Sequence, residues 1–158
     1  MRTRIISAFP GTRKTFYHNL HKDTTLDSDS SLFSWIETAE GKIRNSDFPA
    51  NYIQHIKENI GKYQFIFVSS HKEVRDALLA NCLFFYLVFP DEMHKAQYIK
   101  KYQDRGSPES FVNLISNNWE KWLKECRFCE IGCKQIEMVF ENLDKELQHI
   151  VASESGDK

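Results

Sequence analysis

The residues best suited to chemistry lie in an early turn, where Lys14 and Thr15 follow the run Gly11-Thr12-Arg13. An apolar, strand-like stretch precedes the turn, and helical spacing follows it. Backbone N–H groups at the start of such a helix attract anions, an ammonium group binds phosphate oxygens, and a hydroxyl can bind Mg²⁺. The turn therefore predicts a site for a polyphosphate and its magnesium ion.

The stretch from Ala8 to Thr15 follows the P-loop pattern G-x-x-x-x-G-K-[ST], with Ala8 and Arg13 at its two glycine positions. If the second position needs a left-handed backbone, a side chain there costs about 1–2 kcal/mol, or roughly a ten- to thirty-fold loss of affinity. The guanidinium of Arg13 can instead bind phosphate itself. An ordinary basic loop is the alternative interpretation, because short motifs often match by chance.

Positive charge is concentrated around this turn, because the first 22 residues contain five lysines or arginines and no acid. Over the whole chain, 21 Lys and Arg stand against 22 Asp and Glu, which gives a net charge of −1. A nearly neutral chain has no field strong enough to make duplex nucleic acid its main partner, so any anion site must be local. Binding of single-stranded nucleic acid by the N-terminal basic residues is a further alternative, and it predicts affinity that falls steeply with salt.

Two carboxylates follow the next strand of the predicted sheet, in the sequence Leu26-Asp27-Ser28-Asp29-Ser30-Ser31. Alternate residues of an extended segment point the same way, so Asp27 and Asp29 can face one site. A solvated turn rich in Asp and Ser is the alternative.

Hydroxyl and imidazole groups end a later predicted strand, in the sequence Phe67-Val68-Ser69-Ser70-His71. Ligands of open parallel sheets bind at the carboxyl ends of the strands. Ser70 and His71 are therefore candidate substrate contacts. A lone histidine that is only a surface residue is the alternative.

A basic helical segment at residues 91–108 carries Lys100, Lys101 and Arg105. Mobile cations that close over a phosphoryl group stabilise the charge that develops on its oxygens and exclude water. Arg105 is the first candidate, because the guanidinium fork matches the geometry of phosphate. A solvated helix face is the alternative.

Apolar periodicity places these residues on an alternating series of strands and helices. Continuous apolar runs predict strands that are buried on both faces, and an alternating run predicts an edge strand. The strand segments are residues 5–7, 65–68, 83–89 and 135–140. The helical segments are residues 49–60, 72–81, 91–105 and 107–123. We therefore expect an α/β fold with a parallel sheet of about five strands and helices on both faces.

The chain has 158 residues, which suits one domain over residues 1–150 and a flexible tail over residues 151–158. Its 41% hydrophobic and 27% charged residues exclude a disordered or collagen-like chain. The longest apolar run, residues 82–89, is far shorter than the ~20 residues that span a bilayer. The N-terminus lacks the apolar stretch of a secretory signal. These features predict a cytoplasmic protein with no membrane partner.

Cys126, Cys129 and Cys133 lie close together, and the first two have the spacing of a metal site. A structural zinc site needs four ligands, and His149 is the one loose candidate for a fourth. We therefore expect reduced, partly buried thiols, with a metal site as the alternative.

Several of these stretches together resemble the small P-loop nucleotide-kinase-like proteins found in bacteriophages, which are similar to nucleoside monophosphate kinases and shikimate kinases. The stretches are residues 8–15, 26–31, 65–78 and 105–111. The resemblance covers most of residues 1–140. It implies a three-layer P-loop NTPase-type fold, ATP and Mg²⁺ as cofactors, and a LID-like segment at residues 91–108.

The resemblance also implies roles for residues on the donor side. The loop from Gly11 to Thr15, with the Lys14 amine, would hold ATP. Thr15 and Asp27 would set the Mg²⁺ ion, and Arg105 would clamp the phosphoryl group during catalysis.

On the acceptor side, the resemblance implies that Asp29, Ser70 and His71 contact the substrate, with Lys101 as a further cation. The implied function is that of an ATP-dependent phosphotransferase acting on a nucleotide or a nucleoside-like small acceptor. The alternative is a catalytically decayed P-loop domain that binds a phosphorylated ligand or a partner protein without turnover. Arg13 favours this alternative, and the sequence leaves the acceptor and the oligomeric state open.

Overall fold

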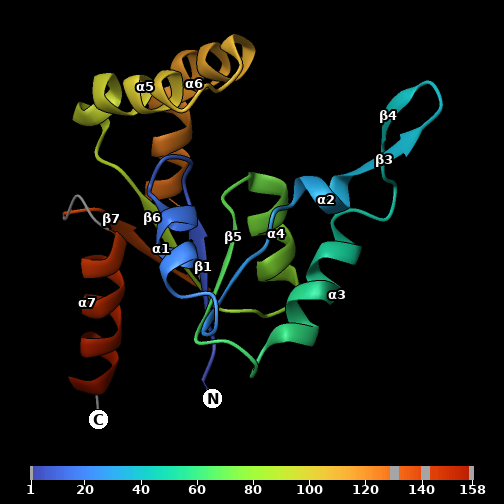
Figure 1. Ribbon diagram of the computed structural model, residues 1–158. Helices are drawn as coiled ribbons and strands as arrows, with labels where there is room; N and C mark the ends of the chain where they lie inside the picture. Colours follow the sequence, from blue (N-terminus) through green and yellow to red (C-terminus); the bar gives the residue numbers. More distant parts are fainter. Residues whose placement is uncertain (1, 129–131, 140–142, 157–158) are drawn as a thin grey trace.

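The sheet at the centre of the molecule has five parallel strands in the order β2-β5-β1-β6-β7. The computed structural model describes residues 2–128, 132–139 and 143–156 (Figure 1). The strands are β1 (Arg4–Ala8), β2 (Thr25–Asp27), β5 (Phe65–Ser69), β6 (Phe85–Phe89) and β7 (Cys133–Glu137). The predicted parallel sheet is confirmed, and its strand order is consistent with a P-loop-like fold.

Helices cover both faces of this sheet, as predicted, and make it the middle of three layers. The larger ones are α1 (Lys14–Leu20), α3 (Ala50–Asn59), α4 (Lys72–Ala80), α5 (Lys95–Asp104), α6 (Glu109–Arg127) and α7 (Leu143–Gly156). Apolar side chains of α1 and α7 pack on one face, and those of α3, α4, α5 and α6 pack on the other. Short elements complete the chain: α2 (Ser31–Ser34), the 3-10 turn η1 (Glu92–His94), and a hairpin of β3 (Trp35–Thr38) and β4 (Gly41–Arg44).

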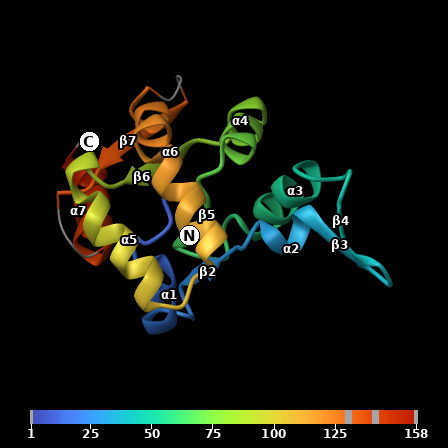
Figure 2. The ribbon, with the colours of Figure 1, turned by 90° about the horizontal axis from the view of Figure 1, so that it is seen from above.

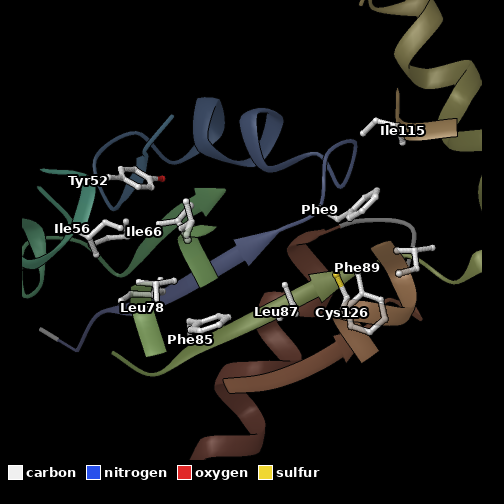
Figure 3. Close-up of a cluster of buried hydrophobic side chains, with 14 of the residues drawn as sticks. Phe9, Tyr52, Ile56, Ile66, Leu78, Phe85, Leu87, Phe89, Ile115 and Cys126 are labelled. Atoms are coloured by element: carbon white, nitrogen blue, oxygen red, sulfur yellow. The ribbon is translucent and has the colours of Figure 1, made fainter. Parts of the chain in front are cut away.

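The central strands are continuous apolar runs because each residue faces one of two hydrophobic layers. Every residue of β5 and β6 is buried. Along β6, Phe85 and Leu87 point toward the α3 to α6 layer, whereas Tyr86 and Val88 point toward α1 and α7. Figure 3 shows the first of these layers, in which Phe9, just after β1, lies near Ile115 of α6. This two-sided burial is the expected pattern for a parallel sheet.

The sheet brings the loops after β1, β2 and β5 to one edge. Ala8 at the end of β1 pairs with Ser69 at the end of β5, and Asp27 at the end of β2 pairs with Phe67. The chain leaves β1 toward α1 on one face and leaves β5 toward α4 on the other. A crevice opens at such a point in parallel sheets, and ligands bind there. In Figure 1, α5 and the start of α6 lie above this edge.

The structure differs from the sequence prediction in two segments. The β3–β4 hairpin, which is exposed along its whole length, was not expected; Figure 2 shows it at the far end of the molecule from α7. Where the sequence predicts a flexible tail, α7 continues to Gly156. The carboxylate of Glu154 forms an ion pair of 2.6 Å with Arg4 and accepts a hydrogen bond from the hydroxyl of Tyr86, so the end of α7 is attached to the sheet. Within the described ranges, no helix is long and apolar enough to cross a membrane.

Candidate functional site

A hydroxyl and a carboxylate meet where α1 begins and β2 ends. Thr15, the second residue of α1, donates a hydrogen bond of 3.1 Å from its Oγ1 to Oδ2 of Asp27. Mg²⁺ is bound in proteins by one or two such oxygen ligands, with phosphate and water completing its octahedron. The structure therefore brings the two predicted metal ligands together.

Lys14 lies beside this pair and is half-buried. Burial lowers the pKa of its ammonium group, while the carboxylates of Asp27 and Asp29 oppose the change and the Arg105 guanidinium adds to it. A partly desolvated cation attracts an anion more strongly than a hydrated one does. Lys14 thus supplies a positive charge held between two carboxylates and near one guanidinium.

A small pocket of about 120 Å³ joins Lys14 to the ends of three strands. Its walls are Ala8 at the end of β1 and Pro10 after it, Asp29 and Ser30 after β2, and residues 69–71 at the end of β5 and just after it. Three residues predicted to contact substrate, Asp29, Ser70 and His71, therefore lie in one pocket with Lys14.

Local backbone geometry positions the polar groups of this pocket. Asp29 accepts a hydrogen bond of 2.9 Å at Oδ1 from the backbone N–H of Ser31, which fixes its side chain at the start of α2. The backbone N–H of His71 donates to Oγ of Ser69 at 3.2 Å. Removal of water lowers the pKa of the His71 imidazole, and the cations Lys14, Arg44 and Arg75 lower it further, against the opposing charge of Glu73. The imidazole therefore faces a positive surrounding.

A buried tyrosine of α3 supports the pocket. The sequence predicts only that this residue belongs to the apolar face of a helix. The Tyr52 hydroxyl donates 2.6 Å to the carbonyl of Ser28 and accepts a 3.4 Å bond from the backbone N–H of Ser69. Burial raises the pKa of this phenol to about 12. Tyr52 thus ties the loop after β2 to the end of β5, and its α3 spacing gave no sign of this role.

Two arginines near His71 were also missed. Arg75 of α4 is buried and donates from Nε to the carbonyl of Ser70 at 2.9 Å. Arg44 of β4 pairs with Glu73 at 2.8 Å and lies over the rings of Trp35 and Phe48. The apolar spacing around Arg75 predicts a helix face, and only the fold brings these two charges near the His71 imidazole, whose pKa they lower.

The first turn contains a left-handed arginine. Arg13 has φ 70° and ψ 28° and stands at the N-cap of α1. Its side chain is exposed, with the guanidinium carbon 5.9 Å from the centre of the Phe16 ring. The left-handed backbone that makes a side chain costly at this position is therefore present, and Arg13 is not among the residues that line the pocket of Lys14.

Thr12 is turned into the loop. Both its backbone N–H and its Oγ1 donate to the carbonyl of Phe9, at 3.3 and 2.9 Å. These two donors of Thr12, which the sequence predicts to contact a cofactor, are thus engaged within the loop itself.

The segment predicted as a LID is folded as η1 and α5 and packs on the first turn. The hydroxyl of Tyr102 donates to the carbonyl of Pro10 at 2.6 Å. A Cβ added to Gly11, whose φ is 90°, would lie 2.9 Å from ring atoms of both Tyr98 and Tyr102. The turn therefore fits α5 only with a bare backbone at Gly11.

Of the three cations predicted in this segment, Arg105 lies near Lys14, whereas Lys100 and Lys101 line a different cavity. Arg105 donates from Nε to Ser107 at 2.9 Å, lies over the Tyr102 ring, and is close enough to lower the pKa of Lys14. The Lys101 ammonium lies 4.3 Å from the centre of the Tyr98 ring and faces a second cavity, of about 460 Å³, that Arg13 also lines. The structure thus separates Lys101 from the acceptor-side residues with which the sequence groups it.

The cysteine cluster adds no site that the structure can show. Cys129 lies outside the described residues, Cys126 is buried in α6, and Cys133 begins β7. Among the described residues, no group of three or more His, Cys, Asp or Glu side chains could hold a metal ion.

Comparisons with known proteins do not identify a family. No family model and no curated protein matches the chain. A solved structure, the crystal structure of an uncharacterized protein from Eubacterium ventriosum ATCC 27560, is similar over 96% of this chain and 97% of its own, with 14% identity and a TM-score of 0.48. A likeness of this degree carries no argument about function.

Proposed function

We propose that the protein is an ATP-dependent phosphotransferase that acts on a nucleotide or a nucleoside-like small acceptor. One observation carries the proposal: the Thr15–Asp27 hydrogen bond lies beside the half-buried Lys14, at the edge of the sheet where the β1, β2 and β5 loops meet. A cation, a metal-binding oxygen pair and a further carboxylate at Asp29 are the groups that phosphoryl transfer needs.

On this proposal, residues on one side of the pocket bind ATP and Mg²⁺, and residues on the other side bind the acceptor. Lys14 binds the outer phosphates of ATP, and Thr15 with Asp27 holds Mg²⁺, which neutralises charge on the phosphate oxygens when bound. Where the acceptor presents a hydroxyl, Asp29 orients it toward the phosphorus and accepts its proton as the new O–P bond forms and ADP leaves. Arg105 adds positive charge as the bond to the leaving ADP lengthens.

The dimensions of the pocket bear on the acceptor. Whole small molecules occupy cavities of roughly 300–1,000 Å³. The pocket around Asp29 has about 120 Å³. It therefore suits the reacting end of an acceptor, with the remainder of that molecule lying outside it.

The test is ADP release from ATP and Mg²⁺ in the presence of each nucleoside monophosphate and nucleoside in turn. We expect one class of acceptor to accelerate ADP release. Asp27→Asn should reduce that rate at least about a hundredfold, because it removes a charge from the metal-binding pair. Asp23→Asn, at an exposed carboxylate in the turn before β2, is the matched control and should retain the wild-type rate. A wild-type protein with no acceptor-dependent ADP release would refute the phosphotransferase.

A second candidate is a decayed P-loop domain that binds a phosphorylated ligand or a partner protein without turnover. The left-handed Arg13, at a position that the P-loop pattern gives to glycine, favours it. Calorimetric binding of ATP without any acceptor-dependent release of ADP would establish this second function.

A further inference from the structure

Two consecutive cations of the first turn face different cavities. Lys14 lines the small pocket with Asp29 and His71, whereas Arg13 lines the 460 Å³ cavity beside α5 and a third cavity, of about 290 Å³, that Phe16 and Asp144 also line. The turn therefore presents one positive charge on each of its sides.

The larger cavity has the chemistry of a polyanion site with an apolar wall. Among the described residues that line it, the permanently charged side chains are those of Arg13, Lys100, Lys101 and Asp104. Pro90, Met138 and Val139 line the apolar part. Guanidinium and ammonium groups bind phosphate oxygens, and an apolar wall suits a flat ring, so the cavity fits a nucleoside polyphosphate.

The conformation of Arg13 is not explained by the helix that it begins. An N-cap residue ordinarily has an extended backbone and a side chain that bonds the first turn, whereas Arg13 is left-handed and its side chain makes no cap hydrogen bond. Glycine would adopt this conformation without strain. Strained residues persist where a site uses them, so the side chain is the feature that a glycine could not supply.

The Arg13 guanidinium is open to a ligand. It is exposed, and within the described part of the chain it has no carboxylate at ion-pair distance; its one ring contact is with Phe16. The Arg13 guanidinium therefore does not block the turn, and no acid of the described residues neutralises it.

We propose that Arg13 is a phosphate-binding residue of the donor site, where its guanidinium binds the polyphosphate chain from the α5 side while Lys14 binds it from the other. This inference rests on the proposed function for the identity of the donor. A glycine at this position would only leave space for the phosphates, whereas the Arg13 guanidinium attracts them.

The experiment measures the dissociation constants of ATP with Mg²⁺ and of inorganic triphosphate by calorimetry, at two salt concentrations. Arg13→Gly removes both the strain and the guanidinium, whereas Arg13→Lys keeps a cation and the strain. Cys82→Gly is the matched control, because Cys82 is the other described non-glycine residue with positive φ, at 54°. Thermal unfolding of each variant shows whether it is folded.

We expect Arg13→Gly to bind both ligands about tenfold more weakly, with a shallower salt dependence, although it unfolds at a higher temperature. Arg13→Lys should lose less affinity, and Cys82→Gly should bind like the wild type. Equal or tighter binding by a folded Arg13→Gly would overturn the role of Arg13. Arg13-dependent binding of triphosphate without ADP release for any acceptor would leave this inference intact and refute the phosphotransferase. Failure of the wild type to bind either ligand would overturn both.

Discussion

Within the described residues, two turns place a side chain in the left-handed region, and they do so for different reasons. Cys82 follows α4, where its N–H donates to the carbonyl of Leu79 at 3.0 Å and the N–H of Leu83 donates to Leu78 at 2.9 Å. This is the Schellman pairing that ends helices, and it requires a left-handed residue. The strain at Cys82 is therefore offset by two hydrogen bonds to the last turn of α4.

Arg13 stands at the N-terminal end of α1, where its side chain forms no capping hydrogen bond that would offset the strain. Its turn is instead fixed by α5, through the Tyr102 hydroxyl on Pro10 and the ring contacts that exclude a side chain at Gly11. The same left-handed conformation therefore ends a helix in the ordinary way at Cys82, whereas at Arg13 it belongs to the turn for which we propose phosphate binding. Substitutions at these two turns and in their surroundings test this difference.

The largest effect is expected for Gly11→Ala. The new Cβ would lie 2.9 Å from both Tyr98 and Tyr102, at a φ of 90°. Backbone strain of about 1–2 kcal/mol and overpacking of about 1–3 kcal/mol should together lower the free energy of unfolding by roughly 3 kcal/mol. Urea denaturation measures this loss.

Gly61→Ala is the control for the backbone part of that loss. Gly61 has a φ of 92°, and nothing lies within 4 Å of a Cβ built there. It should lose only the strain, about 1 kcal/mol. Equal losses at the two glycines would contradict the packing of α5 on the first turn.

Tyr102→Phe should have the next largest effect. It removes the 2.6 Å hydrogen bond to the Pro10 carbonyl and should cost about 1–2 kcal/mol of the free energy of unfolding. Tyr63→Phe is the control, since the Tyr63 hydroxyl makes no hydrogen bond in the described part of the chain, and it should leave the stability within about 0.5 kcal/mol. A Tyr102→Phe protein as stable as the wild type would mean that α5 does not hold the first turn.

The sheet could be predicted from the sequence because burial on both faces makes β1, β5 and β6 continuous apolar runs. The β3–β4 hairpin could not, since both its strands are exposed and carry no one-sided pattern. α7 had a usable signal in Leu143, Leu147 and Ile150, which recur at helical spacing and are buried. Its continuation to Gly156 depends on the Arg4–Glu154 ion pair, a contact that local composition does not contain.

Some residues of the candidate site could likewise be predicted from the sequence, and others could not. Lys14, Asp27 and Asp29 could be found because each lies at or after the end of a predicted strand, and the carboxyl ends of parallel strands meet at one edge of the sheet. Tyr52 and Arg75 could not, because their roles depend on where α3 and α4 pack against the strand ends. The separation of Lys101 from Asp29 likewise follows from the path of α5 over the turn, which no local pattern specifies.

A smaller effect, of opposite sign, is expected where glycine replaces the two left-handed side chains. Arg13→Gly and Cys82→Gly should each raise the free energy of unfolding by about 1 kcal/mol, or roughly 2–4 °C in Tm, because glycine relieves the strain. Thermal unfolding of both variants, beside Lys22→Gly as an exposed residue of ordinary φ, measures it. A destabilised Arg13→Gly would mean that the guanidinium, with its ring contact to Phe16, holds the turn in the absence of ligand.

The smallest effect concerns charge, which the first turn carries and the Cys82 turn lacks. His71 has a lowered pKa, so at pH below about 6.5 the unfolded chain binds a proton there that the folded chain resists. The stabilisation is complete above that pH and declines as the pH falls toward the lowered value. Although neighbouring groups displace part of its water, His71 still lies at the surface, where solvent screens these charges, so we expect less than about 0.5 kcal/mol. The free energy of unfolding can be measured by denaturation at pH 7 and at pH 5. Its decline toward pH 5 should be weaker in Lys14→Met than in the wild type, because this variant lacks a cation that acts on His71. In Lys62→Met the decline should equal that of the wild type. An equal decline in all three proteins would show that the charge of the first turn does not reach His71.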